Sequence, residues 1–415
     1  MAPPLLHATF AADVPVYALV FAGDDHVVFV GGGGAGRSGV ANVIKAASLP
    51  IDPEKPSLRP AGELKLSSQE DAPMCLAIHP SHPHLVCGIN AAADQMSTGP
   101  NQHVRLFEYQ IQDMVDPTEE TEATPGLMSI QPTSSYESLG LSNPDHYQKT
   151  ATFSPDGKFL AVASTNGLVQ LHRYPSMETV FSTHVGVLSL DEEIYDTDFS
   201  HDSRQLAITT ANRLLILSTA PKTTDGDTPT FSPRILQTIE QPKVGSGKGQ
   251  FRMAKFGRGP LLHSSSKHAL YTLINDESVP GSKARRSYVA MWDVDTWTVK
   301  KIRTVSQRPA TVLAVSPNGR LVAVGASDMT LSVYRASTLQ FLCKADKVHD
   351  FPPTCLAFSP NSRMLVSGSA DSSVRVTVLP THLLPRHVIS DESIFVVFCI
   401  LLVLAAMIIP SYLQD

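Results

Sequence analysis

Glycine is concentrated in one stretch near the N-terminus, residues 31–42, which reads GGGGAGRSGVAN. Glycine permits positive φ and a close approach of the backbone to other groups, so this stretch is a candidate binding loop. The G-x-G-x-x-G pattern of dinucleotide-binding loops is matched by Gly31, Gly33 and Gly36. A P-loop pattern is nearly matched as well, with Arg37 where lysine is required.

Both phosphate-binding motifs need a helix directly after the loop, because its N-terminal amides and its dipole hold the phosphate. Here an apolar run at residues 27–30 precedes the loop, and residues 40–45, which begin with β-branched side chains, soon lead to Pro50. This pattern predicts a strand on each side of the loop. Nucleotide binding is therefore disfavoured. Two interpretations remain: a plain hairpin loop, or an ordered loop whose role depends on the rest of the fold.

The composition limits the classes of function. The chain has 415 residues, of which 42% are hydrophobic and 17% charged, so it can bury a large core. A net charge of −6 without a long basic run disfavours nucleic acid as the main partner. The five cysteines have no C-x-x-C spacing, which disfavours a zinc site or a disulfide framework. Cys75 and Cys355, in equivalent apolar segments, are expected to act as small hydrophobic side chains.

A degenerate repeat recurs along the chain. Each copy has an apolar strand, a turn of the Ser-Pro-Asp-Gly type and a second apolar strand. Four copies are clear and the fifth is weaker: residues 152–162, 198–208, 314–324, 357–367 and 77–88. Units of several strands at this spacing are typical of WD-repeat propellers, whose repeats have about 40–45 residues. We therefore predict an all-β fold, a seven-bladed WD-repeat-like β-propeller.

The expected blades follow from the positions of the repeats. They lie near residues 14–50, 72–110, 147–183, 190–240, 248–304, 308–345 and 350–380. Residues 5–10 are expected to pair with the last blade and close the ring, which leaves no free sheet edge. Trp292-Asp293 preserves one signature dipeptide of WD repeats. His349 and Asp371 correspond to WD-repeat residues of a buried hydrogen-bond network, so we expect a structural pair rather than a catalytic one.

The C-terminal region has a different composition. Residues 394–410 read IFVVFCILLVLAAMIIP, an uncharged run about as long as a bilayer requires; a buried core helix is the alternative. Arg386 and His387 precede the run and no basic residue follows it, so the positive-inside rule places the propeller in the cytosol. The expected organisation is a propeller at 1–383, a linker at 384–391, a transmembrane helix at 392–410 and a lumenal tail at 411–415. Polar insertions, expected to be loops, lie at 112–145, 219–230 and 276–287.

The glycine stretch, the propeller and the C-terminal span together resemble the Sec-twelve-type guanine nucleotide exchange factors of the endoplasmic reticulum. The animal member of this family is the prolactin regulatory element-binding protein. The marker of the family is a first-blade loop of the form GGGG-x-x-x-x-G-(Ile/Val)-x-Asn. All its fixed positions are matched, by Gly31, Gly32, Gly33, Gly34, Gly39, Val40 and Asn42. The segment His103–Tyr109 is similar to the family's second-blade strand.

The resemblance implies an exchange factor that activates a Sar-type small GTPase at the endoplasmic reticulum membrane. This step starts assembly of coat protein complex II for export to the Golgi. In the family a potassium ion orders the loop, and backbone carbonyls suit such a cation. The candidate carbonyls are those of Gly31, Gly32, Gly33, Gly34, Ala35 and Gly36. Asn42 matches the family's functionally important asparagine, and we expect its amide to contact the GTPase; a plain turn residue is the alternative.

The resemblance implies neither covalent chemistry nor a nucleotide bound by this chain. Nucleotide exchange requires only that the chain binds the nucleotide-free GTPase more tightly than the nucleotide-bound GTPase. Two other classes of function remain open. The first is a tail-anchored propeller scaffold without exchange activity. The second is a DNA-binding regulator, suggested only by the name of the animal protein. The acidic net charge and the lack of a basic stripe disfavour a nucleic-acid partner.

Overall fold

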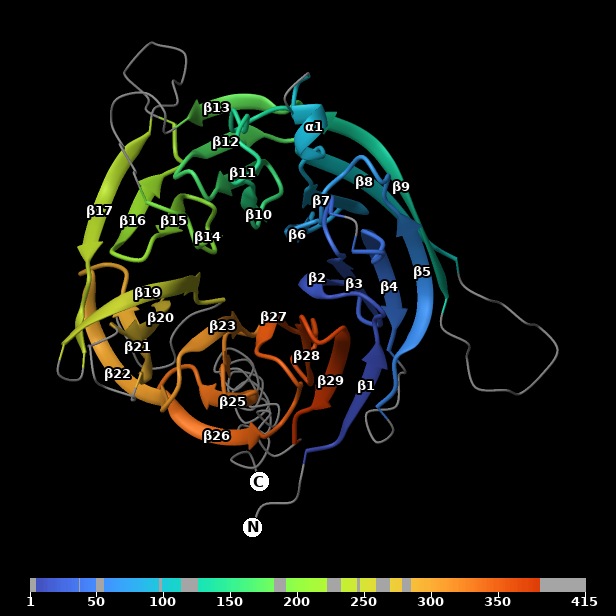
Figure 1. Cartoon of the computed structure of the whole chain (residues 1–415). Helices are drawn as coiled ribbons and strands as arrows, with labels where there is room; N and C mark the ends of the chain where they lie inside the picture. Colours follow the sequence, from blue (N-terminus) through green and yellow to red (C-terminus); the bar gives the residue numbers. More distant parts are fainter. Residues whose placement is uncertain are drawn as a thin grey trace, which may run out of the picture. The chain divides into compact units, whose positions relative to one another are not determined.

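The computed structural model describes residues 5–36, 38–49, 56–96, 99–112, 126–182, 192–221, 233–244, 247–258, 269–277 and 285–380. One compact unit spans Met1–Val378 and contains every helix and strand given below. Figure 1 shows its strands as seven sheets arranged around a common centre.

The first four blades follow one another along the chain. Blade 1 consists of β2 (Val16–Ala22), β3 (His26–Gly31), β4 (Val43–Ser48) and β5 (Arg59–Lys65). Blade 2 consists of β6 (Cys75–Ile78), β7 (His84–Gly88), the short helix α1 (Ala93–Met96), β8 (Val104–Gln112) and β9 (Leu127–Tyr136). Blade 3 consists of β10 (Gln148–Phe153), β11 (Phe159–Ser164), β12 (Val169–Arg173) and β13 (Glu178–Ser182). Blade 4 consists of β14 (Asp196–Phe199), β15 (Gln205–Thr209), β16 (Arg213–Ser218) and β17 (Arg234–Glu240).

The last three blades complete the set. Blade 5 consists of β18 (Lys243–Val244), β19 (Gly247–Phe256), β20 (Ala269–Asp276), β21 (Ser287–Asp293) and β22 (Thr298–Ser306). Blade 6 consists of β23 (Ala310–Val315), β24 (Leu321–Ala326), β25 (Thr330–Arg335) and β26 (Gln340–Ala345). Blade 7 consists of β27 (Pro353–Phe358), β28 (Met364–Ser369), β29 (Ser373–Val378) and β1 (His7–Ala11). The predicted seven-bladed propeller is confirmed.

The repeated turn explains why these sequences form paired strands. In blade 3 the Ser154 hydroxyl donates to the Asp156 carboxylate at 2.6 Å and accepts the Phe159 N–H at 3.0 Å. Gly157 supplies the positive φ of 71° that the turn requires. The same bond from a backbone amide to the turn serine is made in three other blades, by Gln205, Leu321 and Met364. The turn thus fixes the register of the two inner strands in these four blades.

Apolar cores lie between neighbouring blades. Ile44 of blade 1 belongs to one buried cluster with Phe107 of blade 2. Phe29 of blade 1 belongs to another with Val376 of blade 7. Each sheet is therefore covered by a neighbour on both faces, which makes the propeller one continuous folding unit.

The N-terminal strand closes the ring. β1 pairs antiparallel with β29, and Phe10 lies opposite Val374. The innermost strands contact one another in the order β2, β6, β10, β14, β19, β23, β27 and back to β2 (Figure 1). The predicted pairing of the N-terminal segment with the last blade is confirmed, and it joins the two ends of the propeller.

The alternating strand directions divide the connections between two rims of the propeller. The chain passes from the first to the second strand of a blade at one rim, and from the second to the third strand at the other. Connections to the next blade leave from this second rim, which we call the loop rim. Residues 31–42, 66–74, 89–103 and 346–352 therefore share the loop rim.

The expectation of a loop over residues 112–145 is wrong in part. β9 occupies Leu127–Tyr136 as the outermost strand of blade 2. Its sequence, LMSIQPTSSY, is polar because an outer strand exposes much of its surface, so the apolar alternation is weak.

Several other predicted segments lie largely outside the described residues. These are the insertions at 219–230 and 276–287, the linker at 384–391, the helix at 392–410 and the tail at 411–415. In the part of the chain that the structure describes, no helix has the length and apolarity needed to cross a membrane.

Candidate functional site

The glycine loop, residues 31–42, joins β3 to β4 at the loop rim of blade 1. β3 ends at Gly31 and β4 begins at Val43. The strand predicted on each side is confirmed. β4 stands where both phosphate-binding motifs would need the N-terminus of a helix.

Two glycines of the loop are required by the close approach of other atoms. A Cβ on Gly31 would lie 1.8 Å from the carbonyl oxygen of Pro15. A Cβ on Gly32 would lie 2.1 Å from Asn42 Oδ1 and 2.7 Å from Asn42 Cα. Gly34 has a φ of 80°, a conformation that favours glycine. The glycines therefore shape a packed loop rather than a slack one.

Asn42 fastens the two ends of the loop to each other. Its Oδ1 accepts the Gly34 N–H at 3.0 Å, and its Nδ2 donates to the Gly34 carbonyl at 3.3 Å. The same Nδ2 donates to the Glu70 carbonyl at 2.9 Å. The Asn42 backbone carbonyl accepts the Leu66 N–H at 2.9 Å. Asn42 thus joins the glycine loop to residues 66–74, the anchoring connector between blades 1 and 2.

The Asn42 amide, which we expected to contact the GTPase, points into the protein in this structure, and direct contact with a partner stays a prediction. The residue is 7% exposed, and both ends of its amide are occupied by Gly34 and Glu70. A buried amide with its bonds made inside the protein has little to offer an incoming surface. The importance of Asn42 for exchange stays a prediction, and the geometry gives it the part of a positioning residue.

Asp71 provides a second link between the glycine loop and the anchoring connector. Its Oδ1 accepts the Ala35 N–H and the Ala72 N–H, both at 2.8 Å. Beside it, Glu70 pairs with Arg105 of blade 2 at 3.2 Å. The loop is therefore held by a carboxylate as well as by Asn42, and the carboxylate places a negative charge against the glycine backbone.

The loop carbonyls form an oxygen-rich site. Gly32, Gly33 and Gly34 each accept one hydrogen bond through the carbonyl oxygen. The donors, Tyr17, Ser38 and Asn42, lie at 3.1, 3.4 and 3.3 Å respectively. Each carbonyl has a second lone pair. These carbonyls and the nearby Asp71 carboxylate are the kind of donors that a hard monovalent cation binds.

Tyr17 lies against this oxygen-rich site. Burial and the nearby Asp71 charge raise the pKa of the Tyr17 hydroxyl. The phenol therefore stays protonated and donates to the Gly32 carbonyl at neutral pH. Tyr17 thus helps to fix the start of the glycine loop from inside the propeller.

The outer part of the loop faces solvent. Ala35, Gly36 and residues 38–41 are exposed, and Val40 is 36% exposed. Gly39 has a φ of 77°. Arg37 lies outside the described residues. A partner that approaches the loop rim would meet this exposed segment, and not Asn42 beneath it.

Three residues of the site were missed by the sequence reasoning: Tyr17, Glu70 and Asp71. None of them belongs to the glycine motif or to the strand repeats. Only the folding of blades 1 and 2 brings them to the loop, so no local pattern could have identified them.

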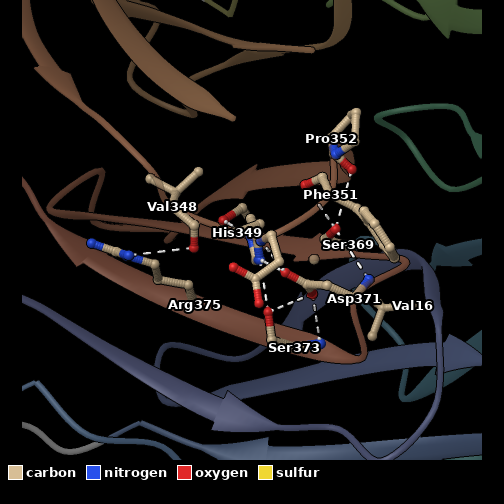
Figure 2. Close-up of polar contacts among 12 residues, drawn as sticks. Val16, Val348, His349, Phe351, Pro352, Ser369, Asp371, Ser373 and Arg375 are labelled. Atoms are coloured by element: carbon tan, nitrogen blue, oxygen red, sulfur yellow. Dashed lines mark hydrogen bonds and ion pairs between the residues drawn. The ribbon is translucent and has the colours of Figure 1, made fainter. Parts of the chain in front are cut away.

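The His349–Asp371 pair is structural, as predicted. His349 makes bonds of 2.7 Å and 2.8 Å to the hydroxyls of Ser373 and Ser367, and Asp371 lies 3.3 Å from its Nδ1 (Figure 2). Burial lowers the pKa of His349. Both ring nitrogens are thus occupied within blade 7, where they fix the approach to β27.

We searched the described residues for other sites of chemistry. Within the described ranges, no group of three or more His, Cys, Asp or Glu side chains could hold a metal ion. Cys75 is buried as expected, and burial raises the pKa of its thiol to about 12. The glycine loop therefore remains the leading candidate for function.

Comparisons with known proteins agree with this fold. A family model described as "WD domain, G-beta repeat" matches residues 300–335 and 342–377. The chain is 24% identical over 348 residues to the protein SED4 of Candida glabrata. The matched region makes up 78% of this chain and 31% of SED4.

Two further relatives have related names. "SEC12-like protein 1" of Arabidopsis thaliana is 24% identical over 208 residues, which is 49% of this chain and 43% of that protein. "Guanine nucleotide-exchange factor SEC12" of Candida glabrata is 27% identical over 213 residues, 49% of this chain and 40% of that protein. The matched region is thus less than half the length of each of these three curated relatives.

Proposed function

Because the chain is a WD-repeat propeller of the SEC12 type, we propose that it is a guanine nucleotide-exchange factor for a small GTPase. One observation carries the proposal: a glycine loop, locked at both ends by Asn42, presents an exposed segment at the loop rim of blade 1. A rigid exposed loop suits binding of a partner, since little conformational freedom is lost when the complex forms.

The proposed GTPase is of the Sar type. In this proposal the protein acts at the endoplasmic reticulum membrane, with its propeller in the cytosol, and starts assembly of coat protein complex II. The apolar run at residues 394–410 supports membrane attachment. The net charge of −6 argues against a nucleic-acid partner.

The mechanism is one of differential binding. If the loop rim binds the nucleotide-free GTPase more tightly than the GDP form, linkage requires that nucleotide binding is weakened by the same factor. GDP then leaves, and GTP replaces it because it is supplied in excess. The residues of the loop need no covalent step: Asn42 and Asp71 hold the backbone, and the exposed segment makes the contact.

We further propose that a potassium ion orders the loop. The carbonyls of Gly32, Gly33 and Gly34, with the Asp71 carboxylate, are the groups that would hold it. When bound, the ion would neutralise the repulsion among these oxygens. The hydrogen bonds from Asn42 to Gly34 and Glu70 would then keep the loop backbone in this conformation.

The proposal is tested by nucleotide release. The full chain, in detergent micelles, is added to a purified Sar-type GTPase loaded with fluorescent GDP, in potassium buffer with excess GTP. We expect GDP release to accelerate in proportion to the concentration of the propeller protein. Release at the spontaneous rate would rule out exchange activity, and stable binding without acceleration would identify a scaffold instead.

A further inference from the structure

A cavity lies where the innermost strands of the blades begin. Its volume is about 440 Å³, and all seven blades contribute to its lining. Connections enter these strands from the loop rim, so the lining residues lie near that rim. Tyr17 lines the cavity and also donates to the Gly32 carbonyl. Tyr17 therefore connects the lining of the cavity to the glycine loop.

Phe351 lies in the connection at residues 346–352, at the loop rim. It directly precedes Pro352, which lines the cavity at the entry to blade 7. The side chain of Phe351 is 57% exposed, the largest exposed fraction of any large apolar side chain in the described ranges. Solvent exposure of so large a ring is unfavourable unless a partner covers it.

The backbone on both sides of Phe351 is held firmly. Ser369 Oγ donates to the carbonyls of Phe351 and Pro352, at 3.0 and 3.2 Å (Figure 2). The Asp350 N–H donates to Asp371 at 2.7 Å. The structural network of blade 7 thus fixes the segment that carries the exposed ring. An exposed aromatic side chain on a fixed backbone is a candidate for an energetic anchor in a protein interface.

The cavity also carries positive charge. Lys255 is paired with Asp196 at 2.8 Å, and Lys149 with Glu193 at 3.4 Å. The Arg252 guanidinium lies 5.0 Å from the centre of the Tyr195 ring. Among the described residues, Arg252 has no carboxylate within ion-pair distance. In a chain of net charge −6, this cation is a local site for an acidic group.

We propose that Phe351 and Arg252 form the second contact for the same GTPase that the glycine loop binds. The GTPase surface at this contact has an apolar side chain that covers Phe351 and a carboxylate that pairs with Arg252. The inference rests on the proposed exchange function and deepens it. The glycine loop changes the affinity of the GTPase for nucleotide. The contacts of Phe351 and Arg252 with the GTPase supply binding energy that is the same for its GDP-bound and its nucleotide-free form.

The test separates binding from exchange. Rates of GDP release by the full chain are measured against GTPase concentration for the wild type, Phe351→Ala and Phe341→Ala. Phe341 is the matched control, because it is 44% exposed but lies on the outer strand of blade 6. Removal of an anchor of this kind weakens binding by about tenfold. We therefore expect KM to rise about tenfold in Phe351→Ala, with the maximal rate within twofold of wild type and no change in Phe341→Ala.

Arg252→Gln is an independent second variant. It should raise KM several-fold and reduce the dependence of KM on salt, because a charge pair is lost. Thermal unfolding of each variant checks that the fold is intact. Unchanged KM in Phe351→Ala or Arg252→Gln would overturn the inference while leaving exchange activity in place. If the wild type itself does not accelerate release, the proposed function fails and this inference fails with it.

Discussion

Replacement of Asn42 by alanine is the sharpest perturbation of the loop. The change removes three hydrogen bonds, two with Gly34 and one with Glu70. At a net contribution of about 0.5–1.5 kcal/mol per bond, the ordered loop loses roughly 1.5–4.5 kcal/mol. That loss lowers the equilibrium constant for loop ordering by about tenfold or more, since 1.4 kcal/mol corresponds to tenfold. The ordered fraction of the loop falls by no more than its equilibrium constant does, so we expect exchange, measured as kcat/KM for GDP release, to fall by up to that factor.

A matched control isolates this effect. Asn318 also bonds its neighbours through its side chain, to Ser316 at 2.7 Å and to the Arg320 N–H at 3.0 Å. Its turn joins β23 to β24 and lies on the rim opposite the glycine loop. Asn318→Ala should therefore cost stability of similar size and leave exchange unchanged. Wild-type exchange by a folded Asn42→Ala variant would refute the reasoning.

Three further predictions concern the packing of the glycine loop, the ion proposed to order it and the buried His103. Gly32→Ala should reduce exchange as much as Asn42→Ala, because its Cβ would lie 2.1 Å from Asn42 Oδ1. Gly247→Ala in β19 of blade 5, where a Cβ meets nothing within 4 Å, should leave the rate unchanged, and equal rates in the two variants would contradict the importance of this packing. Asp71→Asn keeps an oxygen for the Ala35 N–H but removes the charge, so this variant should need a higher potassium concentration than the wild type for half-maximal exchange. Replacement of potassium by lithium should lower the exchange rate of the wild type. If the exchange rates of both proteins did not depend on the cation, no ion would order the loop. Burial lowers the pKa of His103 to about 4, below the ordinary value of about 6.5. Between these two pH values the unfolded chain binds a proton that the folded protein does not. The free energy of unfolding should therefore decrease as pH falls from about 6.5 to about 4. His103→Gln should flatten the dependence of unfolding free energy on pH in that window by up to about 1.4 kcal/mol per pH unit, and parallel curves would show that His103 is not the titrating group.

The fold could be predicted because its signals are local and repeated. Each Ser-Pro-Asp-Gly type of turn fixes a hairpin through bonds within six residues, such as that between Ser154 and Phe159. Copies at nearly regular spacing then indicate blades. The strand Leu127–Tyr136 was missed because its outward position allows polar residues, and no apolar alternation marks it.

The candidate site could be predicted only in part. The glycine loop is a continuous motif, so its position was visible in the sequence. The orientation of Asn42 was not, because an asparagine amide can satisfy its bonds inside the protein or with a partner. Tyr17, Glu70 and Asp71 come from other segments, and their role depends on how the anchoring connector packs against the loop.

We propose that the exposed segment of the glycine loop binds the nucleotide-free GTPase. Amide hydrogen exchange of the full chain, with and without the nucleotide-free GTPase, would detect this contact at the residues concerned. We expect residues 35–41 to gain protection in the complex, while protection of the turn at residues 316–320, on the opposite rim, stays unchanged. If the amide hydrogen exchange of the glycine loop were the same in the complex as in the free protein, the proposed contact would be contradicted.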